Sequence, residues 1–120
     1  MATDAADQIW FSKITGHEVE LPIAVEATAG QKFKIICTED MSIPPTGGIH
    51  TISFGYRVIV PLGHVGHFYS IHDGSDGLIT RCRILHPDDT DEFWTTAVNN
   101  GNSMIELKKG TFMGYLQRKP

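Results

Sequence analysis

The chain has 120 residues, of which 41% are hydrophobic and 20% are charged, and its formal net charge is −4. This composition is that of a single globular domain, and the acidic balance argues against a general nucleic-acid binder, which needs a basic surface. No apolar run is as long as a transmembrane helix, so direct insertion into a membrane is not expected.

The expected redox environment follows from the cysteines, Cys37 and Cys82, which both lie within apolar runs. Two such residues are typical of buried thiols in a reducing compartment and not of a disulfide framework. The N-terminal segment lacks the hydrophobic region of a signal peptide. We therefore expect an intracellular protein, cytoplasmic or nuclear.

The first half of the chain reads as short strands separated by turns. Residues 1–8 are expected to form a frayed tail. Strands rich in β-branched and aromatic residues are predicted at Ile9–Ile14, Leu21–Val25 and Lys32–Cys37. A polar loop is expected over Glu39–Ser42, and the prolines and glycines of Ile43–Gly48 predict a turn that no helix could cross.

The second half continues this pattern, and no segment of ten or more residues combines helical periodicity with a cap. Strands are predicted at Ile49–Phe54, Tyr56–Pro61, His67–Ile71, Leu78–Leu85, Phe93–Val98, Met104–Leu107 and Phe112–Leu116. Residues 117–120 are expected to form a short tail. The sequence therefore predicts an all-β fold, a jelly roll or β-sandwich, in one domain spanning residues 9–116.

Polar chemistry is concentrated in two loops between these strands, Asp73–Gly77 and His86–Asp91. Imidazoles suit Zn²⁺ and Cu²⁺, so His64, His67 and His72 are a candidate metal set. Nothing in their spacing indicates that the three rings converge. We therefore expect packed or solvated histidines and no metal site.

Several fragments occur in an order that resembles one family. They are Ile43–Gly47, Val60–Gly66, Glu92–Asn99, Ile105–Gly110 and Met113–Leu116. Together they resemble the trimeric dUTPases, β jelly-roll enzymes that hydrolyse dUTP to dUMP and pyrophosphate. The resemblance covers roughly residues 9 to 116 and is carried mostly by scaffold positions.

The positions that carry the family's chemistry are altered. The segment Gly30–Ile35 has no carboxylate where the resemblance implies an aspartate that helps to hold Mg²⁺. Ile71 occupies the position where the resemblance implies a phosphate-binding arginine, and an aliphatic side chain cannot replace a guanidinium. His86 stands at the water-activating aspartate, Asp89 at the deoxyribose-discriminating tyrosine and Tyr115 at a glutamine.

The resemblance is closest in kind to the dUTPase-derived early-region proteins of adenoviruses, which keep the fold and lose the catalytic motifs. It implies a viral protein of an infected cell that is not an enzyme, has no catalytic residue and no cofactor, and binds host proteins. The remnant nucleotide-site positions are Ser70, Ile71, His72, Asp73, His86, Asp88 and Asp89. The candidate partner-contact residues are Asp73, Ser75, Asp76, Asp88, Asp89 and Asp91.

The resemblance also implies a homotrimer, with an interface near the last strand and the aromatic residues Trp10 and Phe11. The chain ends in Gln-Arg-Lys-Pro, so a PDZ interaction is not expected. Two alternatives stay open. One is an active dUTPase or related nucleotide pyrophosphatase with remodelled motifs, which would use Mg²⁺, and the other is an unrelated β-sandwich with a structural or ligand-binding role.

Overall fold

The computed structural model describes residues 8–14, 16, 18–25, 32–45 and 48–120, and these contain strands and no helix. The strands are β1 (Trp10–Lys13), β2 (Ile23–Val25), β3 (Lys32–Ile36), β4 (Met41–Ile43), β5 (Ile49–Ile59), β6 (Val65–Ser70), β7 (Leu78–Thr80), β8 (Arg83–Leu85), β9 (Glu92–Asn99), β10 (Ile105–Leu107) and β11 (Phe112–Lys119). The predicted all-β, single-domain fold is confirmed. In the described part of the chain, no helix is long and apolar enough to span a membrane.

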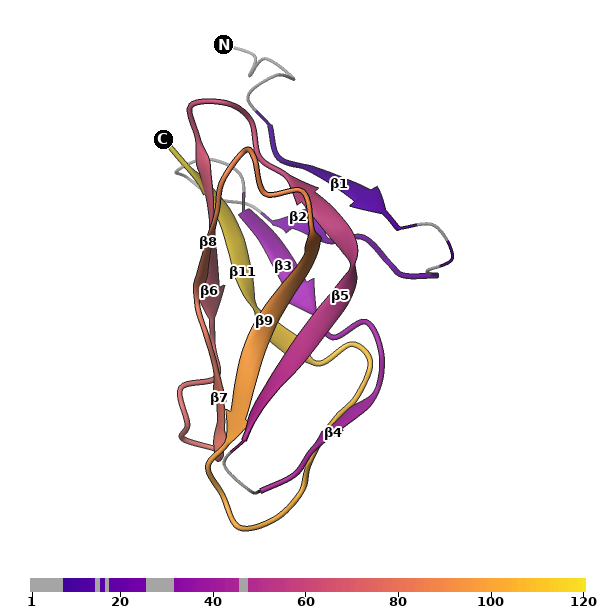
Figure 1. Ribbon diagram of the computed structural model, residues 1–120, viewed down its shortest axis with the longest axis vertical. Helices are drawn as coiled ribbons and strands as arrows, with labels where there is room; N and C mark the ends of the chain where they lie inside the picture. The colour runs from indigo at the N-terminus through magenta and orange to yellow at the C-terminus, as the bar shows by residue number, and fades with distance from the viewer. Residues whose placement is uncertain (1–7, 15, 17, 26–31, 46–47) are drawn as a thin grey trace.

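The strands form two main antiparallel sheets with the core between them (Figure 1). The first sheet has the order β1-β5-β9-β7, and the second has the order β2-β3-β11-β6-β8. A small two-stranded ribbon, β10-β4, extends from one end of the molecule (Figure 1). The long strands β5 and β9 run side by side and make the most extensive pairing of the first sheet.

The core follows from the alternation of side chains along each strand. In β3, Phe33 and Ile35 are buried while the side chain of Lys34 is exposed. At the centre, the aromatic rings of Phe54 and Phe93 stack at 4.7 Å, and the ring of Phe68 packs edge-on against Phe93 at 5.4 Å. Aromatic rings bury large apolar areas, so this cluster contributes much of the stabilisation that joins the two sheets.

Gly55 explains why the two strands predicted at Ile49–Phe54 and Tyr56–Pro61 form a single strand in the structure. Its φ angle is +81°, and the pairing of β5 with β9 shifts register between Ser53 and Arg57 around it. Such an irregularity bends a strand without ending it, and glycine adopts this φ at little cost. The apolar runs before and after Gly55 therefore form the single strand β5.

Four other expectations are corrected by the structure. Met41–Ile43 forms β4, in the region expected to be a loop and a turn. The predicted strand Leu78–Leu85 divides into β7 and β8, which belong to different sheets. Cys82 lies at that crossing and is exposed, although Cys37 is buried as expected. Strand β11 extends through Lys119, into the segment expected to be a tail.

Parts of three predicted features lie outside the described residues. These are residues 1–7 of the expected tail, residues 30–31 of the first motif and residues 46–47 of the proline–glycine turn.

Candidate functional site

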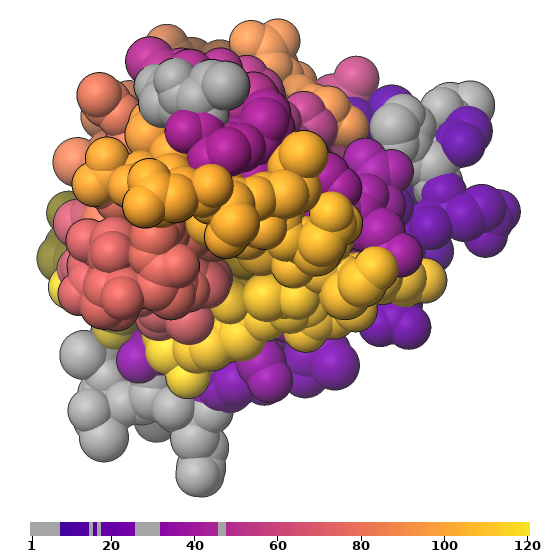
Figure 2. All heavy atoms as spheres, turned by 90° about the horizontal axis from the view of Figure 1, so that it is seen from below, coloured from indigo at the N-terminus to yellow at the C-terminus, as the bar shows by residue number. Residues whose placement is uncertain are grey.

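The first polar loop follows directly from the end of β6. The backbone N–H of Ile71 donates to the carbonyl oxygen of Met113 at 3.1 Å, which ties the start of the loop to β11. Further along, the carboxylates of Asp73 and Asp76 accept hydrogen bonds from the backbone N–H groups of Ser75 and Leu78, each at 3.1 Å. Two aspartates therefore hold the loop in shape through their own turns. Figure 2 views this end of the molecule from below and shows the residues near 70 packed beside the C-terminal strand.

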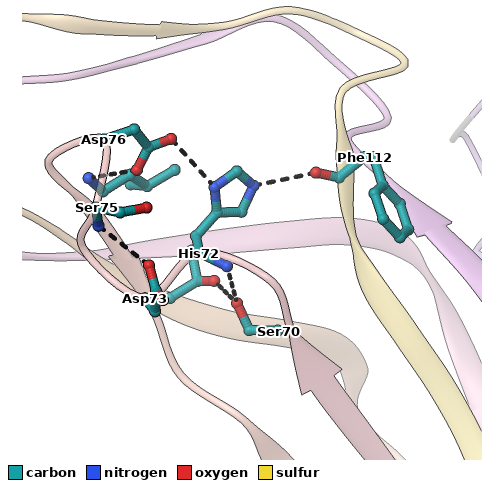
Figure 3. Close-up of polar contacts among 8 residues, drawn as sticks. Ser70, His72, Asp73, Ser75, Asp76 and Phe112 are labelled. Carbon is teal, nitrogen blue, oxygen red and sulfur yellow. Dashed lines mark hydrogen bonds and ion pairs between the residues drawn. The ribbon is translucent and has the colours of Figure 1, made fainter.

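His72 anchors this loop to β11 (Figure 3). Its Nε2 atom lies 3.0 Å from the carbonyl oxygen of Phe112, and its Nδ1 atom lies 3.6 Å from Oδ2 of Asp76. Only 11% of the His72 side chain is exposed. Because both ring nitrogens are engaged, His72 is placed as a structural residue and not as a free acid or base.

Ser70 is also engaged. Its hydroxyl shares a hydrogen bond with the hydroxyl of Thr80 and accepts another from the backbone N–H of His72 at 3.1 Å. Among the described residues no base is placed to remove its proton, so Ser70 is no nucleophile in this geometry. Ile71 is 46% exposed and presents an alkyl chain where the resemblance implies a guanidinium.

The exposed side chains of this loop are acidic. Hydrogen bonds from the backbone and the hydroxyl of Ser75 hold the pKa of Asp73 below its ordinary value, because they stabilise the charged carboxylate. Asp76 and Ser75 are exposed beside it. The loop therefore presents negative charge to solvent, which repels a triphosphate that approaches it alone.

The second polar loop is the turn between β8 and β9. The backbone N–H of His86 donates to Oδ2 of Asp89 at 2.7 Å, and the N–H of Asp89 donates back to the carbonyl oxygen of His86 at 3.0 Å. Asp89 thus closes the turn with its side chain. His86, Asp88, Asp89 and Asp91 are all exposed, and the imidazole of His86 has no hydrogen-bond partner in the described part of the chain.

A small cavity of about 100 Å³ lies under this turn, lined in part by Arg83, Leu85 and Asp89. The guanidinium of Arg83 lies 4.0 Å from the centre of the Trp94 ring, and its Nη1 donates to the carbonyl oxygen of Trp94 at 2.7 Å. Burial lowers the pKa of Arg83, and the nearby charge of Asp89 acts against that shift. The cavity is too small for a nucleotide, so the turn does not form a nucleotide pocket by itself.

One chain does not bring the two loops together. Gly66, near the start of β6, pairs with Leu85 just before the His86 turn, whereas Ser70 at the end of β6 leads into the His72 loop. Four residues of strand separate these points, which is roughly 13 Å. Figure 1 shows the turn between β8 and β9 at the upper end of the molecule and the loop between β6 and β7 in the lower half.

Between the loops, the outer side of the second sheet carries lysines over aromatic rings, a feature that the sequence analysis did not identify. Nζ of Lys32 lies 4.2 Å from the centre of the Tyr115 ring, and Nζ of Lys119 lies 5.5 Å from that of Tyr69. We call this surface the lysine–aromatic face, and its members are Lys32, Lys34, Tyr69, Phe112, Tyr115 and Lys119. Strands β3, β6 and β11 contain no Asp or Glu, so the face is positive in an acidic chain.

Metal ligands are not assembled in the described residues. No group of three or more His, Cys, Asp or Glu side chains there is arranged to hold a metal ion. The ring of His67 stacks on Tyr69 at 3.9 Å, and that of His72 is bound to the Phe112 carbonyl. Lys32 and Lys34 place ammonium groups where the resemblance implies a Mg²⁺ carboxylate. These residues do not fit Mg²⁺, because ammonium groups supply no oxygen ligand and repel a cation.

Comparison with solved structures identifies the fold. The chain superposes on the dUTPase of Staphylococcus bacteriophage 80alpha with a TM-score of 0.78 and 13% sequence identity, covering 94% of this chain and 90% of that one. A mutant dUTPase from phage phi11 of S. aureus gives the same TM-score, identity and coverage. The dUTPase-like fold is thereby confirmed. No family model matches the sequence, and no curated protein matches it.

These comparisons correct one prediction. The chain was expected not to be an enzyme, but the structures that share its fold are dUTPases, and one of them is described in terms of its enzymatic activity. Another was solved with dUpNHpp. The altered motifs had favoured a non-enzyme, whereas it is the scaffold that these structures share with the chain.

Proposed function

We propose that the chain is a nucleotide pyrophosphatase of the dUTPase fold, with remodelled motifs, that hydrolyses a nucleoside triphosphate to the monophosphate and pyrophosphate. The observation that carries this proposal is the likeness over 94% of the chain to a dUTPase. The substrate class is a deoxynucleoside triphosphate, with dUTP as the first candidate.

The site is composite. In one chain the His86 turn and the lysine–aromatic face lie at different places on the second sheet, and neither encloses a nucleotide. A second copy that brings its His86 turn to this face would place acidic and basic groups opposite each other. We therefore infer that the active form is a homo-oligomer, for which we propose the trimer that the resemblance implies.

In this site His86 is the general base. Its imidazole is exposed and unengaged in the described part of the chain, and histidine is the side chain that most often serves this role. It accepts a proton from the water whose oxygen attacks the α-phosphorus, as the bond from that phosphorus to the pyrophosphate breaks. Lys32, Lys34 and Lys119 bind the phosphates as point charges, in place of the missing guanidinium.

Pyrophosphate release from dUTP and from each of the four common dNTPs tests this proposal. The altered base and the missing arginine each lower the rate of hydrolysis roughly a hundredfold, so turnover is expected to be slow but measurable. The substitution His86→Ala should reduce the rate by about a hundredfold or more. Thr90→Ala, an exposed change in the same turn, is the matched control and should leave the rate unchanged. Release no faster than the buffer blank with every nucleotide would overturn the proposal.

A second function, binding of a host protein by a viral dUTPase-like protein, is supported by a separate observation. The two acidic loops expose Asp73, Ser75, Asp76, Asp88, Asp89 and Asp91 at opposite ends of β6. The phage 80alpha dUTPase is described as controlling transfer of virulence genes by a G protein-like mechanism. This role is compatible with hydrolysis. Charge reversal at Asp76 and Asp88, with capture from a host lysate as the readout, should reduce binding, and undiminished capture would contradict it.

A further inference from the structure

The outer side of the first sheet carries a shallow groove of about 420 Å³. We call it the Trp94 groove, and it is lined by Ile49, Arg81, Cys82, Arg83, Trp94 and Thr96. It shares Arg83 and Trp94 with the cavity under the His86 turn. It extends away from that turn, because Trp94 pairs with Ser53 while Ile49 pairs with Val98, four residues further along β9.

The floor of the groove is apolar and exposed. Ile49 is 69% exposed and Trp94 is 37% exposed, although both belong to the central strands of the sheet. The apolar row continues across the sheet, because Ile49 pairs with Val98 and Val98 pairs with Ile79. A contiguous apolar surface on a sheet is typical of an interaction site, whereas single exposed apolar residues are not.

The groove is also positive. Arg83 is held in place by its stacking on the Trp94 ring and by its hydrogen bond to the Trp94 carbonyl. The side chain of Arg81 is exposed and pairs with no acidic residue in the described part of the chain. No Asp or Glu lines the groove. The two arginines are two residues apart, a separation of at most about 7 Å in extended chain, which matches alternate residues of an extended ligand.

Extension of the sheet by an added strand is blocked along residues 94–96 of β9, which lie beyond the end of β7. The carbonyl oxygen of Trp94 accepts from Arg83, and that of Thr96 accepts from the backbone N–H of Arg81 at 3.0 Å. The hydroxyl of Thr95 donates to the carbonyl oxygen of Arg81 at 2.7 Å. Since these backbone acceptors are occupied, a ligand must be recognised by side chains and not by β-strand addition.

We propose that the Trp94 groove binds a short, extended, acidic segment of a partner protein. Two carboxylates at alternate positions pair with Arg81 and Arg83, and an apolar side chain packs on Ile49, beside the Trp94 ring that Arg83 covers. A peptide is favoured over a single-stranded nucleic acid because the groove offers aliphatic surface and one indole, which Arg83 already covers. The groove shares Arg83 and Trp94 with the cavity under the His86 turn, but it uses none of the residues proposed for hydrolysis, so either proposal could fail without the other.

Cys82 supplies a direct readout. It is an exposed thiol in the groove, whereas Cys37 is 2% exposed, and burial raises the pKa of the Cys37 thiol to about 11. A thiol-reactive reagent should therefore label Cys82 first in the folded protein. A ligand in the groove should slow that labelling and alter the fluorescence of Trp94.

The probes are acetylated octapeptides in which two aspartates flank a leucine, isoleucine, valine or phenylalanine, with asparagine-for-aspartate peptides as their controls. We expect at least one acidic peptide to bind and to protect Cys82 from alkylation. We expect Arg81→Ala to weaken the binding of that peptide about tenfold. Arg57→Ala, an exposed arginine on the same sheet outside the groove, should have no effect.

Three outcomes would overturn the proposal. The first is that no acidic peptide binds with a dissociation constant below about 1 mM. The second is that the asparagine peptides bind as well as the aspartate peptides. The third is that a single-stranded oligonucleotide protects Cys82 better than any peptide does.

Discussion

His72 explains, at the level of one residue, why this loop differs from a phosphate-binding loop. A phosphate site needs donors that point outward to the ligand. Here the ring points inward, toward the Phe112 carbonyl and the Asp76 carboxylate (Figure 3). The hydroxyls of Ser70 and Thr80 share a hydrogen bond. The hydrogen-bond donors of the loop are thus used within the fold, so the proposed hydrolase binds the phosphates elsewhere.

Cys37 gives a prediction about pH. Burial raises the pKa of its thiol from 9.0 to about 11. Below pH 9 the thiol is protonated in both the folded and the unfolded chain. Between pH 9 and 11 only the unfolded chain loses the proton, so the free energy of unfolding falls as the pH rises, by about 2 to 3 kcal/mol at pH 11.

The substitution Cys37→Ala should remove this part of the pH dependence. Urea unfolding of both proteins at pH 8 and pH 10.5 measures it, and Tyr56, whose pKa burial also raises, is common to both and cancels in the comparison. We expect the wild-type protein to lose more stability than the variant over this interval. Equal losses would show that Cys37 does not ionise on unfolding.

Among the elements, strand β11 depends on a single glycine. Gly114 has a φ angle of +150°, and the pairing of β11 with β3 shifts register just before it. A Cβ atom at this position would overlap the backbone carbonyl of Tyr69 in β6. β11 is the central strand of the second sheet, so any shift there displaces its neighbours on both sides.

We expect Gly114→Ala to destabilise the protein by more than about 3 kcal/mol, or to prevent folding altogether. Gly63→Ala is the matched control, because Gly63 also has a positive φ but a Cβ atom there would meet open space. That variant should lose only about 1 kcal/mol from backbone strain. Thermal unfolding of the two variants compares them, and similar melting temperatures would contradict this account of β11.

Much of the element pattern could be predicted, because strand periodicity and turn residues are local signals. β4 was missed because its three residues lie between polar and proline-rich segments, and its partner β10 is more than sixty residues away. The division of Leu78–Leu85 was missed because Arg81 and Cys82 carry the chain from one sheet to the other. Nothing in the sequence between the two halves marks that crossing as a turn.

The two polar loops lie between strands, as predicted, but their arrangement in space was not predictable. Their separation depends on the register of β6 with β8 and β11. The lysine–aromatic face joins residues of three strands, and alternation along β3 alone indicated only that Lys32 and Lys34 share a face. The exposed position of Cys82 likewise depends on tertiary structure.

At the scale of the whole molecule, association should cover the lysine–aromatic face. Chains of this size gain stability from burying apolar surface, and cyclic symmetry is the usual arrangement of identical copies. We expect light scattering at micromolar concentration to give the mass of three chains, or about 40 kDa from 13.3 kDa each. A monomer mass that persists at high protein concentration would contradict the trimer and the composite site.

The central claim is that hydrolysis uses His86 from one copy and the lysines from another. Mixed oligomers of a His86→Ala chain and a Lys32→Ala/Lys34→Ala chain test it most directly, with pyrophosphate release from the best substrate as the measurement. Each variant alone should be nearly inactive. In an equal mixture, about a quarter of the sites combine an intact turn with an intact face, so about a quarter of the wild-type rate should return. A mixture as inactive as its parents, beside an active wild-type protein, would contradict the composite site.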